Sequence, residues 1–141
     1  MSTSTIRIIT ALVLIIHGIG HAMAFVPALN IFSTDKWHYR SWLLTGILGD
    51  TVSRVLVVIL FGAALIGFIA SGLGLLGWLV PHSAWQTLAI FAAVISLVAL
   101  GLFWNSFASL FPNKLGAIVV DVATLWALLG SGSFSEIIKN L

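Results

Sequence analysis

Long apolar runs separated by short polar connections dominate the chain. A membrane-spanning helix needs about 20 apolar residues, and four runs meet that length. Pro27 follows the first run and is expected to end its helix, because proline lacks the amide hydrogen that a helix interior needs. We therefore predict an all-α fold, an integral membrane up-down four-helix bundle forming a single transmembrane domain over 1–141. The predicted spans are about 6–26, 52–76, 84–104 and 113–129.

The first connection, 28–51, is the most polar part of the chain. It combines charged residues with Trp37 and Tyr39, a mixture typical of the lipid headgroup region. Its end, 42–48, is apolar enough to lie in the interface or to fold back against the bundle.

The C-terminal residues show the pattern of a short amphipathic helix. Ser133 and Glu136 have the spacing of a capping box, in which both side chains bond to the first turn of a helix. Four apolar residues recur at steps that place them on one face: Phe134, Ile137, Ile138 and Leu141. We predict a short helix lying on the membrane surface.

Composition supports the membrane class and excludes several functions. Hydrophobic residues make up 60% of the chain and charged residues 7%, whereas a soluble domain has about 25% charged residues. The six Lys and Arg residues are scattered, so no nucleic-acid partner is expected. The chain has no cysteine, which excludes disulfides and thiolate metal sites.

Two histidines interrupt the first apolar run. His17 and His21 are four residues apart, so both lie on one helix face about one turn apart. Ionisable groups at this depth are costly, and a functional role is the default hypothesis for them. The same interruption favours a retained first span over a secretory signal, which the Ala22-Met23-Ala24 sequence otherwise resembles.

Counting residues along four alternating spans places several polar groups in one half of the bilayer. Asp121 falls at the depth of the two histidines, since each residue advances a helix by about 1.5 Å. Both chain ends are expected on the opposite side. The predicted ligand-binding residues of the resulting pocket are His17, His21, Asp121, Arg54, Asn105, Trp104 and Trp42.

Five of these residues also have a simpler interpretation. The histidines and Asp121 are able to bond only to neighbouring helices and lock the bundle. Arg54 sits at the end of a span, where its long side chain reaches lipid phosphate. Asn105 is placed to bond to a helix end. The sequence leaves these alternatives open, assigns no catalytic residue, and leaves open whether the protein is an enzyme.

The preferred ligand is a small apolar molecule such as a quinone. A quinone carbonyl accepts a hydrogen bond from histidine, and a His–Asp pair is able to pass a proton. Trp42, Trp104 and Phe107 are expected to flank the ring. A divalent metal on the two histidines and Asp121 is the weaker expectation, because the sequence lacks the second acid typical of catalytic hydrolases and has no His-Glu-x-x-His motif. Haem is not expected, since two histidines on one helix face cannot bind iron from opposite sides.

A second interpretation, of a different class, is a non-catalytic structural or assembly subunit of a larger membrane complex. Ala63, Gly67 and Ser71 form a small-residue stripe in the second span, which allows another helix to approach closely. The partner would be a membrane protein or a second copy of the chain.

The first span resembles that of the DoxX-like family of small membrane proteins. The matching features are Arg7, the apolar run 8–16 and His17-Gly18-Ile19-Gly20; His21 stands where a lysine is more usual in the family. The resemblance implies four membrane helices and an association with membrane redox systems, including small subunits of quinone-linked oxidoreductases. It also implies a multi-pass protein of the cell membrane, in a bacterial or archaeal inner membrane.

Overall fold

The computed structural model describes residues 2–141, and these residues form helices joined by turns and loops, without a β-strand. The prediction of an all-α fold is confirmed. The helices are α1 (Thr3–Gly20), α2 (Phe25–Ala28), α3 (Thr45–Leu75), α4 (Trp85–Leu102), α5 (Leu115–Leu129) and α6 (Ser133–Lys139). Short 3-10 or π-helical segments lie at His21–Ala24, His82–Ala84, Trp104–Ser106 and Leu110–Lys114.

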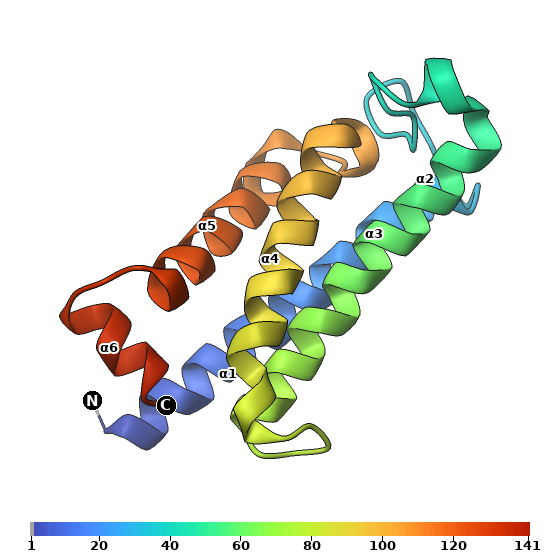
Figure 1. Cartoon of the computed structure of the whole chain (residues 1–141). Coiled ribbons are helices and arrows are strands. Elements are labelled where there is room, and N and C mark those ends of the chain that lie inside the picture. Colours follow the sequence, from blue (N-terminus) through green and yellow to red (C-terminus); the bar gives the residue numbers. More distant parts are fainter. Residues whose placement is uncertain (1) are drawn as a thin grey trace.

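Four long helices lie alongside one another and alternate in direction, and the two ends of the chain lie at the same end of the bundle (Figure 1). α1 packs on α3, α3 on α4, and α4 on α5. Four helical segments of the described chain are long and apolar enough to cross a membrane: Thr3–Ala28, Thr45–Leu75, His82–Leu102 and Leu110–Leu129. These segments contain nearly all of the four predicted spans.

The ends of the first two helices differ from the prediction. The first helical segment continues through Pro27 and ends at Ala28, after a 3-10 stretch at His21–Ala24. α3 begins at Thr45, so residues 45–48 of the apolar piece 42–48 form a helical turn ahead of the main part of this helix. A break follows at Gly49, whose φ of 81° is accessible to glycine because it lacks a Cβ atom.

Close packing between the helices depends on small residues. A Cβ atom at Gly18 would lie 3.0 Å from the Phe68 Cβ, so α1 approaches α3 closely at this point. A Cβ atom at Gly67 would lie 2.9 Å from the Ala92 Cβ. The small-residue stripe predicted in the second span therefore packs against α4 of the same chain at Gly67.

The C-terminal helix α6 packs across the end of the bundle against α5. Ile138 and Leu141 are buried in the core, whereas Phe134 is about half exposed and stacks on Trp126 with ring centroids 5.5 Å apart. The predicted helix is present, but the predicted capping box is wrong. Gly132 occupies the N-cap position and no side chain caps the helix, because Ser133 is already the first residue of α6. The Ser135 hydroxyl donates to the Trp126 carbonyl at 3.3 Å.

Candidate functional site

The two histidines face the interior from the first helical segment, His17 in α1 and His21 at the start of the 3-10 stretch that follows it. His21 is 1% exposed, and the two rings meet edge to face with centroids 4.8 Å apart, as expected for residues one helical turn apart. The Phe68 ring of α3 lies 4.6 Å from the His17 ring. This contact is possible because Gly18 allows α3 to approach α1 closely.

A continuous hydrogen-bond network joins α1, α4 and α5 at these histidines. His17 Nε2 lies 2.7 Å from Asp121 Oδ1, so the two residues lie at one level along the bundle. The Ser96 hydroxyl of α4 donates to Asp121 Oδ2 at 2.5 Å and lies 2.7 Å from His21 Nε2. His21 Nδ1 donates to the His17 carbonyl at 2.9 Å. Four side chains from three helices thus form one polar cluster.

The number of hydrogens in this cluster follows from its donors and acceptors. His21 Nδ1 carries a hydrogen because a carbonyl only accepts, so a neutral His21 has a lone pair at Nε2. The single hydroxyl hydrogen of Ser96 then lies between two acceptors, this nitrogen and the ionised Asp121 carboxylate. One additional proton, on either His21 or Asp121, completes both hydrogen bonds at Ser96.

The surroundings make the charge of this cluster important. Asp121 and Ser96 are each 0% exposed, and the rings of Phe61, Phe68 and Phe107 lie within 6.0 Å of the His21 ring. Burying a net charge in such an apolar environment is costly. With neutral His17 and the additional proton the cluster has no net charge, whereas without that proton it carries one negative charge.

A cavity of about 200 Å³ borders this network. We call it the histidine cavity; its lining includes His17, His21, Phe107, Pro112, Asn113 and Ala117. The His17 side chain retains 9% exposure, and its second ring nitrogen, Nδ1, makes no hydrogen bond to another residue within 2–141. The cavity therefore borders one edge of the hydrogen-bond network.

The same residues have the donor types of a metal site. His17, His21 and Asp121 each offer one ligand atom, and these atoms lie within 4.8 Å of one another, with nitrogen and oxygen donors that suit Zn²⁺. In the structure, however, His17 bonds directly to Asp121 and His21 bonds to Ser96. A cation at the centre would have to replace these hydrogen bonds.

The structure separates Arg54 from this cluster. Arg54 donates to the Asn30 side chain and, at 3.2 Å, to the Ala28 carbonyl, and its guanidinium carbon lies 3.9 Å from the centre of the Tyr39 ring. These partners belong to the first connection and the end of α2, so Arg54 ties the connection to α3.

The other three predicted residues meet at a different cavity. Trp42, Trp104 and Asn105 line a cavity of about 140 Å³ together with His38. The Trp42 indole donates to the Gly101 carbonyl at 2.8 Å. Of the seven predicted ligand-binding residues, His17, His21 and Asp121 form one cluster, Trp42, Trp104 and Asn105 line a second cavity, and Arg54 lies apart from both. Ligand binding by any of the seven stays a prediction.

Sequence reasoning missed two residues. Ser96 lies in an apolar run and has no polar neighbour within several positions, so nothing in the sequence around its hydroxyl indicates that it belongs to the site. Asn113 lines the histidine cavity, whereas the sequence pattern predicts only that it starts the fourth span. Phe107, expected to flank a ligand ring, does line the cavity.

Comparison with models of protein families, with curated proteins and with solved structures finds no match to this chain. The resemblance to the DoxX-like family stays a prediction.

Proposed function

We propose that this protein is a multi-pass membrane protein that binds a quinone-class ring in the histidine cavity. The four long apolar helices and the scarcity of charged residues support a position in the membrane, which we assign to the cell membrane of a bacterium or archaeon. The DoxX-like resemblance of the first span is part of the same proposal.

One observation carries the proposal: a buried proton-bearing network presents two imidazoles to a cavity of ring size. Apolar cavities of about 150 Å³ bind benzene, so a cavity of about 200 Å³ suits one substituted six-membered ring. The Phe107 ring, which lines the cavity, offers an aromatic surface on which a flat molecule packs.

The chemistry of His17 favours an oxygen-bearing ring. Its Nε2 donates to the Asp121 carboxylate, so in neutral His17 the Nδ1 atom accepts a hydrogen bond, for example from a hydroquinone hydroxyl. When His17 is protonated, Nδ1 donates, and its partner is a quinone carbonyl. The adjacent Asp121 stabilises the imidazolium. The site therefore suits both forms of one ligand class.

The alternative of an assembly subunit has less support. This alternative needs the small-residue stripe of the second span to be free for a partner helix, but Gly67 in that stripe packs against Ala92 of the same chain. A surface that is used inside the fold is not available to a partner.

A binding titration tests the proposal. We expect a dimethoxymethylbenzoquinone to quench the tryptophan fluorescence of the protein in lipid nanodiscs saturably. His17→Gln keeps an amide donor toward Asp121 but removes the second ring nitrogen, and it should weaken binding about tenfold or more, because a hydrogen bond to a charged group contributes about 1.5–3 kcal/mol.

Arg54→Gln is the matched control, since Arg54 was predicted at the site but lies with Asn30 and Ala28 instead. It should bind the quinone as the unmodified protein does. Equal affinities of the unmodified protein and His17→Gln, with both folded by circular dichroism, would overturn the proposal.

A further inference from the structure

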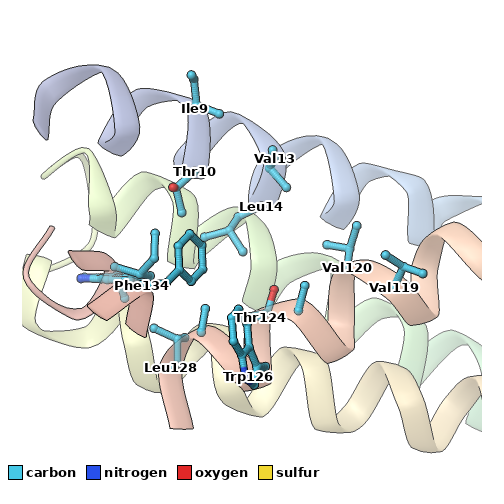
Figure 2. A pocket seen from close by; sticks show the side chains of 14 residues that line it. Ile9, Thr10, Val13, Leu14, Val119, Val120, Thr124, Trp126, Leu128 and Phe134 are labelled. Carbon is cyan, nitrogen blue, oxygen red and sulfur yellow. The ribbon is translucent and has the colours of Figure 1, made fainter. Parts of the chain in front are cut away.

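A second cavity lies between α1 and α5, beside the histidine cavity. It has a volume of about 260 Å³ and is lined almost entirely by apolar side chains, with Thr10 and Thr124 as the only residues carrying a side-chain hydroxyl. Figure 2 shows side chains of α1 and α5 facing each other across it, with Phe134 of α6 at one end. We call it the apolar groove.

The helix periodicity places the groove and the histidine cavity on one line. On α1, positions 9 and 13 line the groove, and positions 16 and 20 line the histidine cavity. On the α5 side, positions 120, 124 and 127 line the groove, and positions 113 and 117 line the histidine cavity. Steps of three and four residues keep each set on one helix face, so the two spaces lie end to end along a single seam.

The seam is long enough for a ligand with an extended hydrocarbon chain and is longer than a single ring needs. Positions 113 and 127 are separated by fourteen residues, which corresponds to about 21 Å along a helix axis. The His17–Asp121 hydrogen bond crosses between the helices near the middle of this length. The groove is also open on the outside of the bundle, since Val13 and Val119 in its lining are 46% and 64% exposed.

We infer that the apolar groove holds an extended hydrocarbon chain attached to the ring in the histidine cavity. This inference rests on the proposed function and names the ligand class more narrowly, as a membrane amphiphile with a polar ring and a long apolar tail. The ligand enters sideways from the lipid, with its ring on the imidazoles and its tail along Val13 and Val120 toward Phe134. The apolar groove beside the polar histidine cavity matches a ligand with an apolar tail and a polar ring.

The test compares a dimethoxymethylbenzoquinone carrying a decyl chain with the same ring carrying none. Both are titrated into nanodiscs containing the unmodified protein, Ala123→Phe or Val13→Phe. The two substitutions fill the groove from opposite walls at exposed positions, so the fold should tolerate them. The quantity compared is the affinity for the quinone with the tail divided by the affinity for the quinone without it. Partition of the tail into lipid is the same for every variant, so it cancels when this ratio is compared between variants.

We expect the groove-filling variants to lower this ratio at least threefold, with the affinity for the ring without a tail unchanged. Val122→Phe is the matched control, because Val122 is the neighbour of Ala123, is 51% exposed and lies outside the groove lining; its ratio should equal that of the unmodified protein. An equal ratio in all four proteins would overturn the tail site and leave the proposed function standing. Failure of both quinones to bind the unmodified protein would overturn both.

Discussion

Ser96 links His21 to Asp121, and its replacement by alanine isolates the energetic role of the polar network. Ser96→Ala removes hydrogen bonds of 2.7 Å and 2.5 Å and leaves an imidazole nitrogen and a carboxylate oxygen without this partner. Interhelical hydrogen bonds in membrane proteins contribute about 0.6 kcal/mol each on average and up to about 1.7 kcal/mol. Two such bonds predict a loss of about 1–3 kcal/mol in the free energy of unfolding.

The chain offers a matched control for this substitution. Ser106, like Ser96, is 0% exposed, but its hydroxyl has no hydrogen-bond partner among the described residues. A buried hydroxyl without a partner is costly, so Ser106→Ala should leave the stability unchanged or increase it. The two variants delete the same atom from equally buried positions and differ in the hydrogen bonds lost.

The assay is reversible unfolding in mixed micelles, followed by circular dichroism and tryptophan fluorescence. The result that refutes the reasoning is equal stability of Ser96→Ala and Ser106→Ala, which would mean that the network contributes nothing to the fold. A loss in Ser96→Ala well above about 3 kcal/mol would show that the additional proton, and not only two hydrogen bonds, depends on Ser96.

Two further predictions concern helix packing and pH. Gly72→Ala should lower the free energy of unfolding by about 1–3 kcal/mol, because the added Cβ atom would lie 2.6 Å from the Ile15 side chain. Gly20→Ala is the control and should not destabilise the protein, since a Cβ atom there meets nothing within 4 Å. Equal unfolding curves for the two variants would contradict this prediction. Burial, and then Arg40, lower the pKa of His38 below 6.5, so the unfolded chain binds a proton at higher pH than the folded chain does. The contribution of His38 to the stability should therefore be constant above about pH 6.5 and decrease as the pH falls toward the lowered pKa, so His38→Gln should lose less stability in acid than the unmodified protein. The same acid dependence in both proteins would refute this assignment.

The helices could be predicted from the sequence because each apolar run is long and ends near proline, glycine or charged residues. The depth of Asp121 relative to His17 could be predicted as well, since a helix advances by a constant rise per residue. The start of α3 could not, because the turn before Gly49 is apolar but its direction depends on one backbone angle.

The side-chain partners of the site were harder to predict. A serine in an apolar helix often bonds to its own backbone, so the sequence does not indicate that Ser96 reaches Asp121. Arg54 has a long side chain that reaches partners in several directions, and its actual partners, Asn30 and Tyr39, lie in a connection whose path has no periodic pattern. Residues on regular helices were therefore placed well, and residues beside irregular segments were not.

The order of the helices along the chain has a consequence for biosynthesis. His17 belongs to α1, His21 to the 3-10 stretch directly after it and Ser96 to α4, whereas Asp121 belongs to α5, the last of the four long helices. The ribosome therefore delivers two imidazoles and a hydroxyl before the carboxylate that completes their hydrogen bonds. Docking of α5 is the step that satisfies these groups, and a nascent chain that stops before Asp121 leaves His17 and the Ser96 hydroxyl without this partner.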